Sequence, residues 1–146
     1  MATMAEGCIL IADDEDGLRW VLEKGFRGAG YQVTAVKDGT AALREAEAQP
    51  FDMILLDIRM PGIDGLTLLG HVRAKRPDAQ VVIMTAHGTV ETAIEAMKKG
   101  AYDYLAKPFD LDEALLLAER ALMARRLAQE VTSLKTGLRE VWEFGA

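Results

Sequence analysis

Acidic, hydroxyl and ammonium side chains stand at or just past the ends of four separate apolar runs. These positions are Asp13-Asp14, Asp57, Thr85 and Lys107-Pro108. If the runs are strands of a parallel sheet, their carboxyl ends meet at one edge, where these side chains would converge. Three carboxylates that lie close together repel one another unless a cation neutralises them. The sequence therefore predicts an acidic, cation-binding pocket at one edge of a sheet.

The predicted cation is a hard divalent ion. Mg²⁺ suits Asp13, Asp14 and Asp57 best, because it binds through one or two carboxylates, keeps several waters and completes its shell with phosphate oxygens. Ca²⁺ would need more protein oxygens, and the run 13–16 lacks the alternating ligands and central glycine of an EF-hand loop. Taken alone, however, Asp13-Asp14 fits a solvated cluster at the start of a helix equally well.

Asp57 adds a nucleophile to this pocket. A carboxylate beside a bound Mg²⁺ can attack a phosphoryl group and form an acyl phosphate. Lys107 would supply a positive charge for the phosphoryl oxygens and Thr85 a hydroxyl donor, as electrostatic catalysis of phosphoryl transfer requires. Each signal is weak alone, because a threonine at a strand end is usually structural and a lysine before proline is usually a surface charge. Their joint placement at strand ends favours phosphoryl transfer to Asp57.

Short apolar runs alternate with segments of helical period, which is typical of βα units around a parallel sheet. The expected strands lie at 8–12, 31–36, 53–56, 81–84 and 102–105. The expected helices carry apolar residues three or four positions apart. In the first helix these are Leu18, Val21, Leu22, Phe26 and Ala29. Asp38 and Asp64 are expected to cap the second and third helices.

Composition and charge restrict the class of protein. The chain has 146 residues, half of them hydrophobic, which is enough for one domain with a sizeable core and a short appendage. No stretch approaches the roughly 18 apolar residues of a membrane span, and the N-terminus lacks the organisation of a signal peptide, so we expect a cytoplasmic protein. The single cysteine, Cys8, is expected to be a buried, inert thiol. A formal charge of -6 argues against direct nucleic-acid binding.

The motifs around the pocket residues resemble those of the receiver domains of two-component response regulators. The matching stretches are Ile9–Glu15, Asp52–Gly65, Met84–Ala86 and Lys107–Phe109. The resemblance covers residues 7–124 and implies a flavodoxin-like, doubly wound five-stranded parallel α/β sheet with strand order 2-1-3-4-5. The sequence pattern of the tail, described below, adds an extended C-terminal helix to this fold. The stretch 84–105 is similar to receivers of NtrC-type, sigma-54-dependent transcriptional activators.

The resemblance implies a role for each acidic residue of the pocket. Asp57 would be the phosphoacceptor and a metal ligand, Asp14 would bind Mg²⁺ directly, and Asp13 would reach the ion through water. The backbone carbonyl of Arg59 would complete the protein ligands. The phosphoryl donor would be a sensor histidine kinase. The domain would be a signalling switch whose only catalysis is its own phosphorylation and dephosphorylation.

The resemblance also implies the moving parts of the switch. Thr85 would swing toward the phosphoryl group while Lys107 pairs with it, and the Lys107-Pro108 peptide bond would be cis. Tyr104 would turn inward as Thr85 moves, although simple packing of an aromatic residue on an edge strand explains Tyr104 equally well. The output face would comprise the helix at 89–99, the last strand and the last helix.

A seven-residue apolar repeat marks the C-terminal segment. Its members are Leu117, Ala124, Leu127, Val131, Leu134, Leu138 and Val141, interrupted only by Arg120. This repeat predicts a two-stranded coiled coil that joins two protomers. A single amphipathic helix folded back onto the domain is the alternative. We therefore divide the chain into a disordered N-terminus (1–6), a receiver domain (7–124) and a helical linker (125–146) leading toward an output domain absent from this chain.

The sequence thus predicts a phosphorylation-activated regulatory domain that controls transcription as a dimer. One alternative is a magnesium-dependent phosphatase that acts on an external substrate. A phosphatase of the haloacid-dehalogenase type would want a second carboxylate two residues after Asp57, where Arg59 stands. The other alternative is an interaction domain that is never phosphorylated, which could dispense with Asp57 or Lys107, yet both are present.

Overall fold

The computed structural model describes the backbone of residues 7–86 and 90–145 and the side chains of residues 7–86 and 91–131. The predicted disordered N-terminus lies outside these residues. The described strands are β1 (Cys8–Ala12), β2 (Gln32–Val36), β3 (Met53–Asp57), β4 (Gln80–Thr85) and β5 (Asp103–Ala106). The described helices are α1 (Asp16–Gly28), α2 (Gly39–Ala48), α3 (Gly65–Lys75), α4 (Val90–Lys98) and α5 (Leu111–Gly145).

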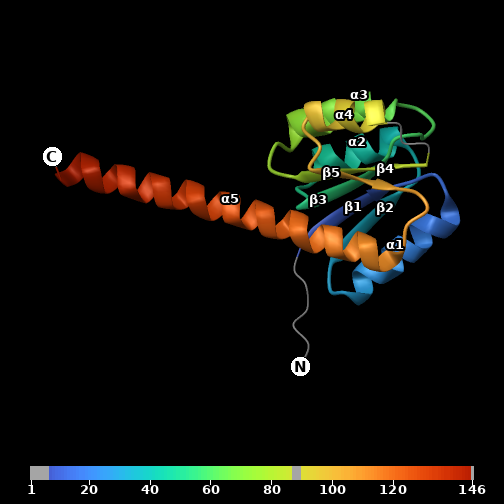
Figure 1. The fold of residues 1–146 in the computed structure, drawn as a ribbon, viewed down its shortest axis with the longest axis horizontal. Helices are drawn as coiled ribbons and strands as arrows, with labels where there is room; N and C mark the ends of the chain where they lie inside the picture. The colour runs from blue at the N-terminus through green and yellow to red at the C-terminus, as the bar shows by residue number, and fades with distance from the viewer. Residues whose placement is uncertain (1–6, 87–89, 146) are drawn as a thin grey trace.

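The strands form one parallel sheet in the order β2-β1-β3-β4-β5, which confirms the predicted doubly wound topology. Helices α1 and α5 cover one face of the sheet, and α2, α3 and α4 cover the other (Figure 1). Because successive strand residues point to opposite faces, Ile9 and Ile11 enter the core beneath α1 and α5, whereas Leu10 and Ala12 enter the core beneath α2 and α3. The strand order reverses between β1 and β3, where ligands bind in open α/β sheets.

The two central strands β3 and β4 are longer than predicted. The sequence pattern ended them at Leu56 and Met84, but the parallel pairing continues to Asp57 and Thr85. Both added residues are polar, so an apolar run could not reveal them as strand residues. The consequence is that Asp57 and Thr85 are held by the sheet itself rather than by a loop.

The predicted caps of α2 and α3 are confirmed, whereas one predicted core residue of α1 is not. Asp38 accepts a hydrogen bond from the backbone N–H of Ala41 at 2.7 Å, and Asp64 accepts one from that of Thr67 at 3.2 Å. In α1 the buried side chains are Leu22 and Phe26, and Val21 is exposed. Val21 precedes Leu22 by about 100° around the helix, which turns it off the narrow face that meets the sheet.

Cys8 is half-buried, so the prediction of a buried thiol was wrong. It begins β1, and its Sγ lies 3.5 Å from the side-chain Oε1 of Gln32 on the neighbouring strand. Burial increases only beyond this first residue, because the four residues that follow it in β1 are all buried.

Helix α5 is one continuous helix that runs past the sheet and away from the domain (Figure 1). It does not fold back onto the domain, so the alternative for the tail is excluded. Leu117 is buried in the core beneath α5 and cannot join a seam between protomers, which corrects the predicted repeat. Leu127 and Val131 are exposed. Leu134, Leu138 and Val141 have side chains outside the described residues.

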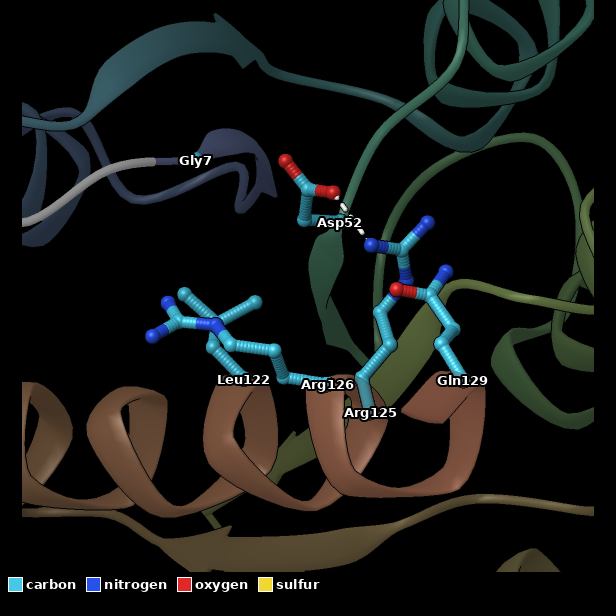
Figure 2. Close-up of a pocket in the computed structure, with 6 residues that line it drawn as sticks. All are labelled: Gly7, Asp52, Leu122, Arg125, Arg126 and Gln129. Carbon is cyan, nitrogen blue, oxygen red and sulfur yellow. Dashed lines mark hydrogen bonds and ion pairs between the residues drawn. The ribbon is translucent and has the colours of Figure 1, made fainter. Parts of the chain in front are cut away.

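Polar contacts anchor α5 at the edge of the sheet where the strands begin, opposite the predicted pocket. Figure 2 shows one of them, the pair of Arg125 and Asp52. The Arg125 guanidinium pairs with Asp52 at 2.7 Å and donates to the backbone carbonyl of Asp78 at 2.8 Å. The other carboxylate oxygen of Asp52 accepts from the backbone N–H of Cys8 at 2.7 Å, and the Gln80 amide donates to the carbonyl of Ala121 at 3.1 Å. These contacts join α5 to the starts of three strands, β1, β3 and β4. Within the described part of the chain, no helix has both the length and the apolar character that crossing a membrane requires.

Candidate functional site

The carboxyl edge of the sheet brings together the residues that the sequence predicted there. Asp13 directly follows β1, Asp57 and Thr85 end β3 and β4, and Lys107 directly follows β5. Asp13, Asp57 and Thr85 are only 0%, 4% and 3% exposed, and they are the buried polar residues of the described chain. Burying such groups costs free energy unless they are hydrogen-bonded or paired. Because all three lie at one edge of the sheet, they indicate a functional site rather than scattered structural polar groups.

Three carboxylates lie within reach of a single ion. Carboxylate oxygens of Asp13, Asp14 and Asp57 all lie within 4.8 Å of one another, with Asp14 exposed and the other two buried. The Oδ2 atom of Asp13 is buried without a hydrogen-bond partner among the described residues. Three carboxylates this close together, with one ammonium between two of them, keep a net negative charge that a hard, oxygen-binding cation would neutralise. The residues present therefore fit Mg²⁺.

Lys107 balances part of this negative charge. Its ammonium lies 2.7 Å from Asp13 Oδ2, an ion pair without the geometry of a hydrogen bond, and it donates to Asp57 Oδ2 at 3.2 Å. Burial lowers the pKa of the Lys107 ammonium, but its interactions with the two carboxylates outweigh this and raise the pKa above its usual value. Lys107 is therefore charged wherever Asp13 and Asp57 are ionised.

The surroundings of Asp57 disfavour its ionised form relative to a carboxylate in water. Burial raises its pKa, and so does the negative charge of Asp13, while the backbone N–H of Arg59 and the ammonium of Lys107 act in the opposite direction. The Arg59 N–H donates to Asp57 Oδ1 at 3.1 Å. A carboxylate that is incompletely stabilised by its surroundings gains from an added cation, and it retains the electron density that a nucleophile needs.

Two close backbone contacts shape the loop after Asp57. The backbone N–H of Ile58 donates to the carbonyl of Met84 at 2.9 Å, which continues the β3–β4 pairing beyond the strand. A Cβ on Gly65, the first residue of α3, would lie 2.5 Å from the Cα and carbonyl oxygen of Ile58. Only glycine permits this approach, and it folds the helix start back against the residue that follows Asp57.

Arg19 fastens the loop that carries Asp13 and Asp14, and the sequence reasoning missed it. Its guanidinium donates to the backbone carbonyl of Asp13 at 2.8 Å and also contacts the carboxylate of Asp16. The only signal in the sequence is the spacing of Asp16 and Arg19, which places the two on neighbouring positions of a helix. That spacing gives no hint of the contact with Asp13, because the acceptor is a main-chain atom.

The two residues of the predicted switch differ in exposure. Thr85 is buried beside Asp57, and its backbone carbonyl accepts from the N–H of Lys107 at 2.7 Å. Tyr104 on β5 is exposed and faces α4, where it lines an apolar groove of about 520 Å³ with Ile94 and Met97. Tyr104 therefore points outward in this structure, and its turning inward stays a prediction.

The Lys107-Pro108 peptide bond is cis, as the resemblance implies. The role of the Arg59 carbonyl as a metal ligand also stays a prediction, since the contact observed for Arg59 is through its N–H.

Comparison with known proteins identifies the class. The family model of the response regulator receiver domain matches residues 9–119, and the chain belongs to this family. It is similar to the DNA-binding transcriptional regulator NtrC of Escherichia coli K12, with 44% identity over 119 residues, which is 82% of this chain and 25% of that protein. The chain thus spans about a quarter of the length of this relative. Its relatives are NtrC-type, sigma-54-dependent response regulators.

Solved structures agree with this assignment. NtrX from Brucella abortus in complex with ADP superposes with a TM-score of 0.84 at 35% identity, over 89% of this chain and 30% of that one. The solution structure of the beryllofluoride-activated NtrC4 receiver domain dimer superposes with a TM-score of 0.77 at 33% identity, over 81% of this chain and 98% of that one. The fold and the class are therefore those of a receiver domain in a two-component system.

Proposed function

We propose that this receiver domain accepts a phosphoryl group from a sensor histidine kinase on Asp57, with Mg²⁺ held by Asp13, Asp14, Asp57 and the backbone carbonyl of Arg59. The observation that carries the proposal is the meeting of buried Asp57 and Asp13 with the Lys107 ammonium at the edge where β1 and β3 end. A buried, ion-paired cluster at the point where the strand order reverses is typical of a reaction site.

The chemistry is a transfer between two side chains. A carboxylate oxygen of Asp57 attacks the phosphorus of a phosphohistidine, an O–P bond forms, the P–N bond breaks, and the imidazole leaves with a proton from solvent. When bound, Mg²⁺ offsets the repulsion between the attacking carboxylate and the incoming phosphoryl oxygens. Lys107 moves its pairing from Asp57 to a phosphoryl oxygen, and the Thr85 hydroxyl donates to another. Asp57 is thus the nucleophile, and Lys107 and Thr85 stabilise the transferred group.

The acyl phosphate on Asp57 adds negative charge to a site that already has a net negative charge. Phosphorylation replaces the single negative charge of the Asp57 carboxylate with a phosphoryl group that carries about two, so Thr85 and Lys107 are drawn toward that group. We propose that Tyr104 then occupies the space that Thr85 leaves, which shifts an existing equilibrium between two forms of the face around α4, β5 and α5. The exposed position of Tyr104 beside α4 supports a role at that face.

We further propose that this switch controls transcription through parts of a longer protein. The receiver (7–124) would connect through the linker helix (125–146) to an output domain, and two protomers would pair along α5 and the linker. The NtrC4 receiver dimer and the length of the NtrC relative support this arrangement. The fragment itself would bind neither nucleic acid nor membrane, would act in the cytoplasm, and would show only self-phosphorylation and self-dephosphorylation as activities.

Intact mass spectrometry tests the proposal. The native chain is incubated with acetyl phosphate with and without Mg²⁺, beside Asp57→Asn and the control Asp78→Asn, whose exposed side chain lies at the opposite edge of the sheet. We expect one labile phosphoryl adduct on the native chain and on the control, formed only with Mg²⁺, and none on Asp57→Asn. An adduct of equal yield on Asp57→Asn would exclude Asp57 as the acceptor.

A further inference from the structure

The β1–α1 loop carries two of the candidate metal ligands and is held in an unusual way. Within the described residues, the N-cap residue of α1, Glu15, makes no side-chain capping hydrogen bond. The loop is instead fastened from inside the helix by Arg19, whose guanidinium donates to the Asp13 carbonyl at 2.8 Å and also contacts the Asp16 carboxylate. The side chain of Arg19 is 20% exposed and that of Asp16 is 88% exposed, so the contact with the Asp13 carbonyl is partly shielded from water and the contact with Asp16 is not. A planar guanidinium that is held by Asp16 and donates to the Asp13 carbonyl restrains the main chain at Asp13.

The fixed main chain determines which oxygen of Asp13 faces the site. Asp13 Oδ1 accepts from the backbone N–H of Glu15 at 2.8 Å, while the buried Oδ2 lies 2.7 Å from the Lys107 ammonium, which also contacts Asp57. The Asp13 backbone N–H donates to the carbonyl of Val36 at 3.1 Å, so the same residue is also tied to β2. Arg19 completes this set of restraints from the helix side.

We propose that Arg19 is a positioning residue for the divalent cation: it holds the main chain of the β1–α1 loop so that the carboxylates of Asp13 and Asp14 are presented to the ion. The inference rests on the proposed Mg²⁺ site and deepens it. Arg19 acts through Asp13, because its contact is with the carbonyl of that residue and not with the carboxylates that face the ion.

Charge and geometry make opposite predictions for this residue. An arginine beside an acidic cluster repels an incoming cation, so if only its charge mattered, removing it would strengthen Mg²⁺ binding. If Arg19 positions the loop, removing it weakens binding, as loss of a group that orients metal ligands typically does by about 10- to 100-fold. Lysine keeps the charge but has no planar fork to serve both acceptors. The two accounts therefore differ in sign for Arg19→Gln and in outcome for Arg19→Lys.

The test is a titration of the folded chain with MgCl₂ alone, followed by the backbone amide signals of the pocket in NMR spectra. Arg27 provides the matched control, because it lies on the same helix, pairs with Glu23 at 2.8 Å and donates to the Val33 carbonyl at 3.1 Å. It stands eight residues, or about 12 Å, further along α1. Arg27→Gln removes the same charge and the same kinds of contact from the far end of the helix.

We expect Arg19→Gln and Arg19→Lys each to raise the Kd for Mg²⁺ about tenfold, and Arg27→Gln to leave it within twofold. A tighter Kd in Arg19→Gln, or an unchanged Kd in Arg19→Lys, would overturn the positioning role. If Arg19→Gln does not fold, Arg19→Lys decides by the same criterion. If the native chain itself shows no Mg²⁺-dependent shifts in the pocket, the proposed function fails rather than this inference alone.

Discussion

The Lys107 ammonium is the main positive charge beside the buried carboxylates at the carboxyl edge of the sheet. It is the cation that the structure places against both Asp13 and Asp57, at 2.7 and 3.2 Å. Two buried carboxylates with one ammonium still leave a net negative charge, and the exposed Asp14 adds to it. The site is therefore electrostatically incomplete, and both a divalent cation and a rearrangement of Lys107 can lower its free energy.

Because the ionised Asp57 is incompletely neutralised, we predict that Asp57→Asn stabilises the metal-free domain. The pKa of Asp57 is raised, first by burial, so its ionised form is disfavoured in the folded state. Replacing it with a neutral amide of the same shape should increase the free energy of unfolding by roughly 0.5–2 kcal/mol at pH 7, the range of single stabilising substitutions. Urea unfolding in EDTA measures this difference.

The raised pKa of Asp57 also determines how the free energy of unfolding depends on pH. For a carboxyl with a raised folded-state pKa, the penalty is absent below the unfolded pKa of about 3.9 and develops as the pH rises through the folded pKa. The advantage of Asp57→Asn should therefore vanish in acid and grow toward neutrality. Adding Mg²⁺ should stabilise the native chain more than the variant. A variant that is less stable than the native chain in EDTA at pH 7 would contradict this account.

At the scale of residues, the sequence located the acidic and basic groups but not the group that orients them. Asp57, Thr85 and Lys107 were predicted because each follows an apolar run. The ends of parallel strands meet at one edge of the sheet, which brings these residues together. Arg19 was missed because its acceptor is the main-chain carbonyl of Asp13, and a contact with a backbone atom leaves no pairing pattern in the sequence.

At the scale of elements, the start of α3 constrains the loop that follows Asp57. Gly65 and Gly70 lie on this one helix and differ in their surroundings: a Cβ on Gly65 would meet the backbone of Ile58 at 2.5 Å, whereas one on Gly70 would meet no described atom within 4 Å. Gly65→Ala should therefore destabilise the domain by about 1–3 kcal/mol through overpacking. Gly70→Ala should stabilise it by up to about 1 kcal/mol through helix propensity.

Denaturant unfolding of the two glycine variants tests this contrast, and phosphorylation by acetyl phosphate adds a second measurement. Gly65→Ala should also slow phosphorylation, because Ile58 cannot move without moving the adjacent Asp57. Equal stability of the two variants would show that the contact at Ile58 is relieved without cost.

The exit of α5 depends on the Arg125 anchor. Arg125→Ala removes an ion pair with Asp52 and a hydrogen bond to the Asp78 carbonyl, and we expect it to cost about 1–3 kcal/mol. It should also increase hydrogen exchange of the backbone amides of α5 near Ala121. Arg126→Ala is the control, because Arg126 is exposed on the next helix position. Matching exchange rates in the two variants would contradict an anchoring role for Arg125.

The tail also shows where sequence periodicity stops being informative. A seven-residue repeat marks one face of a helix but does not say what covers that face. Leu117 lies on the repeat and belongs to the core of the domain, whereas Leu127 and Val131 continue the same repeat into solvent. The change occurs where α5 leaves the sheet, and only the relative lengths of helix and sheet determine that point. The buried ends of β3 and β4 were missed for a related reason, since Asp57 and Thr85 break the apolar pattern while the pairing continues.

At the scale of the whole molecule, two parts of α5 differ in their surroundings. Its first part packs on one face of the sheet, and a later part runs beyond the sheet (Figure 1). The apolar side chains of Leu127 and Val131 on this helix are exposed. A solvent-exposed apolar stripe on a helix is typical of pairing with another helix. Through the anchor at Arg125, such pairing would fix two receivers relative to each other.

Pairing along the linker predicts that Leu127→Ser with Val131→Ser converts a dimer into a monomer. Each aliphatic side chain buried in a helix pair contributes about 1.5–3 kcal/mol, and each chain loses two. Light scattering coupled to size exclusion measures the mass. Leu116→Ser with Met123→Ser is the matched control, because both residues are exposed on α5 but off the repeat. A monomer in the control and a dimer in the test variant would place the interface on the receiver face instead.

The most direct test of the central claim is to locate the phosphoryl group on the chain. The protein is phosphorylated with acetyl phosphate and Mg²⁺, the acyl phosphate is reduced with borohydride, and the resulting homoserine is mapped by peptide mass spectrometry. The account predicts homoserine at position 57 alone. Homoserine at Asp13 or Asp14, or none at any position, would contradict the assignment of Asp57 as the phosphoacceptor.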